Sequence, residues 1–293
     1  MSLDWVSWSH PVGAWWLFLV AVSLGNIIFW FVLRRQLRTG SLEFDAAARV
    51  MLLLCAAYVF GCAFRSVLPR ADVQRICLFD TWLSSVVVGR SVATIAEICF
   101  IIQWAIVLRA LASMVKSDTV RTISAAIVPL IVVAECCSWY AVLTTSYLGN
   151  AVENSLWAVS FLLVTVALAR LFTEFHGAVR GAIGAAILGI AGYLMFLIFV
   201  DVPMYVGRWV HDAASGKALL GVLAGLHDVS TRWTVTQDVA QWRDEMAWMG
   251  LYFSVAVWSS LALCSFELIK GHLPRYRARA VRSGAAQRQV IRA

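Results

Sequence analysis

The chain has 293 residues, of which 61% are hydrophobic and 14% charged, and its mean hydropathy is +0.78. A soluble domain has about half apolar and about a quarter charged residues. The composition therefore excludes soluble enzyme folds, disordered chains and disulfide-rich secreted modules, and it indicates an integral membrane protein of the all-α class. Residues 268–293 carry seven basic side chains and no acidic one, so they account for the whole net charge of +7.

Seven apolar runs of about 20 residues follow one another along the chain, and each is long enough to cross about 30 Å of hydrocarbon. We predict a single domain over residues 1–270, a bundle of seven transmembrane helices, followed by a basic tail over 271–293. The predicted spans are about 14–33, 50–67, 83–108, 122–144, 155–173, 182–204 and 248–269.

The basic residues in the connecting segments predict the orientation of the bundle. The side that holds the tail and the connections after spans one, three and five has 16 Lys and Arg residues, whereas the other side has seven. Cytoplasmic segments are enriched in Lys and Arg, so the N-terminus is predicted outside and the C-terminus inside. Most of the 14 Trp residues lie near the predicted outer interface, as in an aromatic belt.

Spans three and four carry charged side chains in otherwise apolar sequence. Arg90, Thr94 and Glu97 are spaced i, i+4 and i+7, so they share one face of span three. At 1.5 Å per residue, Glu135 in span four lies at about the depth of Arg90, and the two side chains are predicted to form an ion pair. Glu97 lies about 10 Å deeper, near the middle of the membrane.

Two interpretations of Glu97 stay open at this level. It is either a protonated structural group that donates a hydrogen bond, or a proton or cation site that opens outward. Its expected polar neighbours are Asn26 in span one, Tyr193 in span six, and Ser259 and Ser260 in span seven. The Arg90–Glu135 pair is likewise either a lock on helix register or a gate and anionic-ligand contact.

Further polar residues mark a predicted outer vestibule. Asn150 and Glu153 open span five, and Asp201 closes span six. A glutamate at a helix N-terminus is also explained by the helix dipole alone.

The long segment 205–247 is predicted to be an outer loop with a short interfacial helix over 217–226. It contains the pairs His211–Asp212 and His227–Asp228, whose side chains are either solvated polar groups or ligands of a divalent metal. Adjacent residues on a helix point apart, so the sequence favours no metal site. Retinal needs a lysine in the middle of a span, and bound haem or metal needs histidines that face each other in the membrane. The sequence has neither, so we predict no cofactor, and we predict no catalytic residues.

The leading functional hypothesis is movement or sensing of a small solute or ion through an outward-facing polar cavity, with Glu97 as the protonatable group. The alternatives are a seven-helix receptor or signalling scaffold and an interfacial membrane enzyme that uses the outer loop. The expected partners are the lipid bilayer, anionic lipid through the basic tail, and the small solute or ion, but not nucleic acid. A plasma or inner membrane is the expected location.

Overall fold

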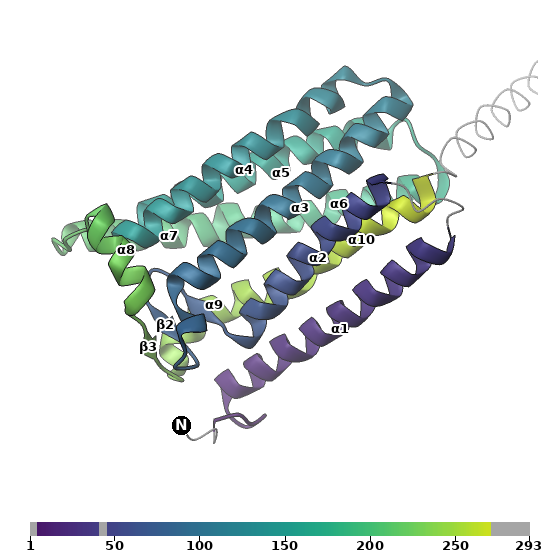
Figure 1. Cartoon of the computed structure of the whole chain (residues 1–293). Coiled ribbons are helices and arrows are strands. Elements are labelled where there is room, and N and C mark those ends of the chain that lie inside the picture. The colour runs from purple at the N-terminus through teal and green to yellow at the C-terminus, as the bar shows by residue number, and fades with distance from the viewer. Residues whose placement is uncertain (1–4, 41–45, 271–293) are drawn as a thin grey trace, which may run out of the picture.

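The computed structural model describes residues 5–40 and 46–270, so the predicted basic tail over 271–293 lies outside the described residues. Seven helices within the described ranges are long and apolar enough to cross a membrane, which confirms the predicted all-α bundle. Figure 1 shows them side by side, with short elements gathered at one end. The orientation of the bundle in a membrane remains a prediction.

Each of the first five spans is a single helix. Their bounds are α1 Pro11–Gly40, α2 Ala46–Val67, α3 Val86–Val115, α4 Asp118–Thr144 and α5 Tyr147–Phe172. The sixth and seventh spans each join two α-helices through a π-helical segment. The sixth comprises α6 Gly177–Phe196, the π-helical segment Leu197–Asp201 and α7 Val202–Ala214. The seventh comprises α9 Val239–Leu251, the π-helical segment Tyr252–Ala256 and α10 Val257–Ile269.

The helices extend beyond the predicted spans because the apolar runs mark only the part of each helix that suits hydrocarbon. The difference is largest in 205–247, where the residues at both ends of the predicted loop belong to α7 and α9. Arg208 on α7 pairs with Asp244 on α9 at 2.8 Å, so an ion pair joins these two helices. A short helix is present near the range expected, but residues 217–221 are not helical and α8 spans Val222–Thr231.

Two connecting segments form a cap on one end of the bundle. We use "cap" for residues 68–85 and 215–238, which include β1 Arg70–Ala71, β2 Ile76–Cys77, the 3₁₀ turn Trp82–Ser84, α8 and β3 Thr234–Val235. β1 and β2 pair antiparallel, and β3 adds to β2 in parallel. Figure 1 shows α8, β2 and β3 together at the end where the N-terminus lies.

Helix α3 has the central position in the bundle. It packs against α2 and α4 along its length and also meets α5, α8 and α10. Small residues permit this close packing: a Cβ added to Gly61 of α2 would lie 3.0 Å from the Ala96 Cβ of α3. Helix α6 packs mainly against α5, whereas α10 packs mainly against α1, α2 and α3. The charged face of α3 is therefore enclosed by other helices.

Candidate functional site

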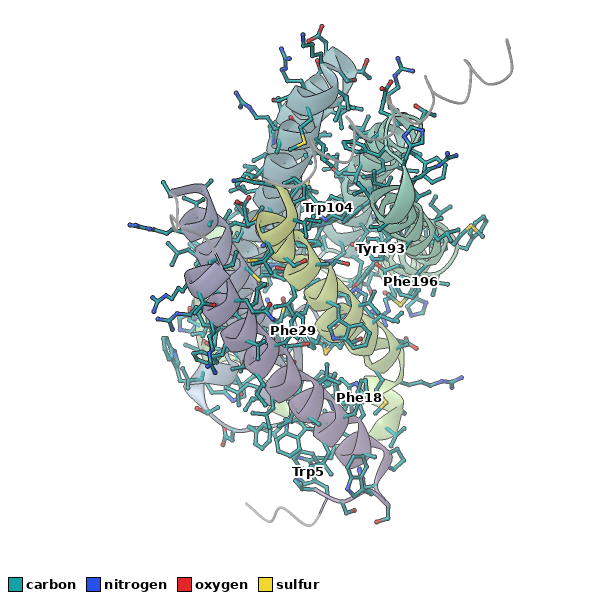
Figure 2. The ribbon with its side chains drawn as sticks, turned by 90° about the vertical axis from the view of Figure 1, so that its right-hand side faces the viewer. Trp5, Phe18, Phe29, Trp104, Tyr193 and Phe196 are labelled. Atoms are coloured by element: carbon teal, nitrogen blue, oxygen red, sulfur yellow. The ribbon has the colours of Figure 1, made fainter. Side chains whose placement is uncertain are left out.

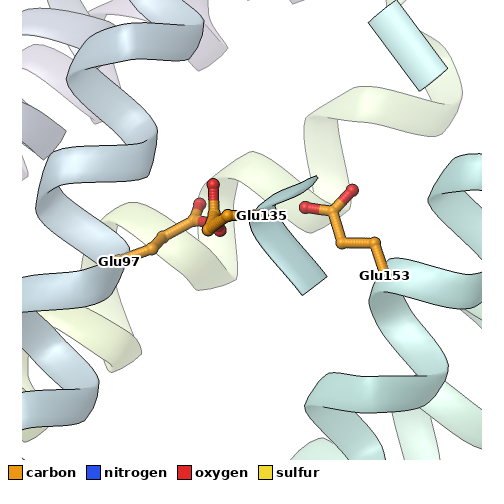
Figure 3. Close-up of side chains that lie close together, drawn as sticks. All are labelled: Glu97, Glu135 and Glu153. Atoms are coloured by element: carbon orange, nitrogen blue, oxygen red, sulfur yellow. The ribbon is translucent and has the colours of Figure 1, made fainter. Parts of the chain in front are cut away.

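Three buried carboxylates surround one buried guanidinium between α3, α4 and α5. Arg90 Nη2 lies 2.8 Å from Glu135 Oε2 and 3.0 Å from Glu97 Oε2, and Arg90 Nη1 lies 3.6 Å from Glu153 Oε1. All four residues are at least 93% buried. Figure 3 shows the carboxylates of Glu97 and Glu135 close together and that of Glu153 turned toward them. We call these four residues the Arg90 cluster.

Hydroxyl and indole groups hold two of the carboxylates in place. Thr94 Oγ1 donates to Glu135 Oε2 at 2.6 Å, and Trp139 Nε1 donates to Thr94 Oγ1 at 3.1 Å. On the other side, the Tyr252 hydroxyl donates to Glu97 Oε1 at 2.7 Å. Tyr252 begins the π-helical segment of the seventh span, and such segments are frequent at functional sites.

Glu153 reaches the cluster because α4 and α5 pack closely. A Cβ on Gly149 would lie 2.6 Å from the Cys137 carbonyl oxygen, so the helices approach with their backbones nearly in contact. Asn150 follows Gly149 on α5, and its Nδ2 atom donates to Glu153 Oε2, one turn further along the helix, at 3.2 Å. Glu153 therefore does more than cap its helix, because its side chain faces Arg90.

The cluster has an excess of carboxylates. One oxygen from each of Glu97, Glu135 and Glu153 lies within 4.8 Å of the others, which is the spacing of groups able to hold a metal ion. If all three were ionised, Arg90 would balance only one of three negative charges. A buried charge without a partner is strongly unfavourable, so this arrangement favours uptake of protons or of a cation.

A cavity of about 1170 Å³ runs beside the cluster. Arg90, Glu97 and Glu153 line it, whereas Glu135 does not. Trp248 and Ile269 both lie on its wall, and at 1.5 Å per residue they are about 30 Å apart along the seventh span. In Figure 2, Trp104, Tyr193 and Phe196 lie between α10 and α6. The cavity therefore extends over a length comparable with the hydrocarbon core of a membrane.

The cap end of the cavity is strongly charged. Arg70 lines it and pairs with Asp72 at 2.8 Å, and Arg70 also donates to the Ser85 carbonyl oxygen. Burial lowers the pKa of Arg70 to about 10, against the opposing effect of Asp72, and nearby Arg65 and Arg90 lower it further. Burial would raise the pKa of Asp72, but Arg70, Arg65 and Arg90 hold it below its usual range. At Asp72 the nearby guanidinium groups therefore outweigh the effect of burial.

The predicted residues of span three and span four thus come together, but Asn26 does not join them. Asn26 Nδ2 donates to the Phe253 carbonyl oxygen at 3.1 Å, and Trp258 Nε1 donates to Asn26 Oδ1 at 3.0 Å. Ser260 donates instead to Gln103, at 2.6 Å. The other two expected neighbours of Glu97 also have different contacts. Ser259 donates to the Val255 carbonyl oxygen and Tyr193 packs against Phe161.

The predicted vestibule residues separate into two places. Asn150 and Glu153 belong with the Arg90 cluster, whereas Asp201 lies in the π-helical segment of the sixth span. Asp201 is 1% exposed, and its Oδ2 atom has no hydrogen-bond partner among the described residues.

The histidines of the long outer segment belong to no group of possible metal ligands within residues 5–40 and 46–270. Their acidic neighbours pair with basic groups instead. Asp212 pairs with Lys217 at 2.5 Å, and Asp228 pairs with Arg75 at 2.8 Å. The polar groups of this segment therefore stabilise the cap.

Three residues that sequence reasoning missed contribute to the site. Tyr252 and Trp139 resemble ordinary interfacial aromatics in sequence, and Arg65 resembles a helix-end charge. The only signal that would have marked Arg65 is its place two residues before the end of an apolar run.

Comparison with known proteins adds no further assignment: no protein-family model, curated protein or solved structure matches this chain.

Proposed function

We propose that this protein moves or senses a small solute or ion through the cavity beside the Arg90 cluster, with Glu97 as the group that gains and loses a proton or cation. The single observation that carries the proposal is a surplus of buried carboxylates on the wall of a cavity that extends along the spans. Ionisable residues buried in a membrane bundle are costly, and they typically mark ion and proton pathways.

The surroundings of the carboxylates favour Glu97 over Glu135 as the exchanging group. Glu135 does not line the cavity, and both Arg90 and Thr94 donate to it. Glu97 lines the cavity and accepts a hydrogen bond from Tyr252, which also lines it. A solute in the cavity would therefore meet Glu97 and Tyr252 but not Glu135, whose ion pair with Arg90 would hold α3 and α4 in register.

The test is ion flux in proteoliposomes that contain the full chain. We expect proton or cation flux in the wild-type protein and its loss in E97Q, because glutamine fits the same space but cannot exchange a proton. Flux is measured with internal pH and cation indicators at mildly acidic and mildly alkaline pH. Gel filtration before reconstitution checks that each variant folds.

The matched control is E267Q, which removes a carboxylate from the same bundle. Glu267 pairs with Lys270 at 2.6 Å and does not line the cavity, so its variant should keep wild-type flux. Wild-type flux in folded E97Q would contradict the role of Glu97. Absence of flux from every variant, wild type included, would contradict movement and leave only sensing.

A further inference from the structure

The cavity is too large and too apolar for an ion alone. Ligand pockets of drug-sized molecules are roughly 300–1,000 Å³, and this cavity exceeds that range. On the side of the Arg90 cluster away from the cap its wall is mostly apolar, with aromatic side chains from α3 and α5 and small side chains from α6. Among these are Phe100, Trp104, Phe161, Ala182, Ala186 and Gly189.

The apolar part of the cavity lies between α6 and α10, and each of these helices packs mainly against other helices. Helix α6 packs mainly against α5, and α10 mainly against α1, α2 and α3. A Cβ added to Gly189 would have no neighbouring atom within 4 Å, so the α6 side of the cavity is open space. A flexible hydrocarbon chain fits a long apolar space of this kind.

At the cap end, one guanidinium on the cavity wall, that of Arg65, forms no ion pair within residues 5–40 and 46–270. Arg65 is 5% exposed and lines the cavity, and no hydrogen bond reaches its Nε and Nη1 atoms from the described residues. Its guanidinium carbon lies 6.0 Å from the Trp248 ring centre and 5.8 Å from that of Phe253. These aromatic faces attract a cation but leave its hydrogen-bond donors free.

We propose that the cavity binds a long-chain anionic amphiphile from the bilayer, a fatty acid, with its carboxylate on Arg65 and its chain between α6 and α10. A carboxylate accepts two parallel hydrogen bonds from a guanidinium, and such charge-assisted bonds are strong. The hydrocarbon chain would cover the surface of α6 that has no neighbouring atoms around Gly189. The inference rests on the proposed function only in using the same cavity, and it names the class of solute.

The first experiment tests the head group. Wild-type protein in phosphatidylcholine nanodiscs is titrated with radiolabelled oleate and with oleyl alcohol, which has the same chain but no charge. We expect oleate to bind about tenfold more tightly or better, the difference that one charge-assisted hydrogen-bonded contact supplies. In R65Q this preference should vanish, whereas in R243Q it should persist because Arg243 is exposed and lies outside the cavity lining.

The second experiment tests the chain. Gly189 and Gly181 lie on the same helix, and a Cβ at either would meet open space, but only Gly189 lines the cavity. G189F should weaken binding of both oleate and oleyl alcohol, whereas G181F should leave both unchanged. This pair gives a result even if R65Q fails to fold.

Three outcomes would overturn the inference. They are equal binding of oleate and oleyl alcohol by the wild type, retained oleate preference in folded R65Q, and equal effects of G189F and G181F. Acetate at the same concentration should not compete with oleate. Competition by acetate would mean that the site binds small anions and does not recognise the hydrocarbon chain. Because binding is measured without flux, its failure is distinguishable from failure of the proposed transport role.

Discussion

Arg90 is the residue on which the buried polar site depends, because it forms ion pairs with Glu97, Glu135 and Glu153 together. Sequence spacing predicted the Arg90–Glu135 pair, since sequential helices are neighbours and both residues lie at about the same depth. It did not predict that Arg90 also reaches Glu97, because that contact lies within one helix and depends on the direction of a long side chain.

At this scale we predict that R90M destabilises the protein by about 3–5 kcal/mol, the usual cost of leaving buried charges without their partner. Thermal and denaturant unfolding in detergent would measure it. Adding E135Q to R90M should recover part of the loss, because it removes one uncompensated carboxylate.

The matched control is R121M. Arg121 pairs with Asp118 at 3.2 Å near the start of α4, but both side chains are more than half exposed, and such pairs contribute about 0–1 kcal/mol. Equal stability of R90M and R121M would show that the cluster is not held by the charge of Arg90.

At the scale of elements, the approach of α4 and α5 determines whether Glu135 and Glu153 can share one guanidinium. Gly149 lies at the closest point, where an added Cβ would also lie 2.7 Å from the Ala141 Cβ. Sequence patterns could not select this glycine from the others, since many glycines of the chain have no close neighbour. Close backbone approach depends on which faces meet.

We therefore predict that G149A destabilises the bundle by about 1–3 kcal/mol, the usual cost of overpacking. G181A, on the open side of α6, should instead be neutral or slightly stabilising, because alanine favours helix more than glycine does. Parallel unfolding curves of the two variants provide the measurement. A stabilised G149A would mean that α4 and α5 do not pack as closely as described.

At the scale of the whole molecule, the cap end and the opposite end should face different sides of a membrane. The excess of basic residues at the connections opposite the cap predicts that the cap is outside. Ser9, near the cap end, and His176, between α5 and α6, are both exposed and suit labelling.

We expect S9C to react with a membrane-impermeant maleimide in intact cells and H176C to react only after permeabilisation. The unsubstituted chain, which keeps its seven native cysteines, gives the background. The reverse labelling pattern would contradict the predicted orientation.

The sequence by itself determined the class of the protein, its seven candidate membrane spans and the pairing of Arg90 with Glu135, because hydropathy and helical spacing are local properties. Only the tertiary structure decided that Glu153 pairs with Arg90, that Tyr252 donates to Glu97, that Asn26 contacts other groups, and that Arg65 lines a cavity. Those contacts join residues up to 227 positions apart, and they depend on which helix faces meet and which side chains remain unpaired after packing. The physical reason is that the bilayer constrains each span separately, whereas the polar site arises from how the spans pack together.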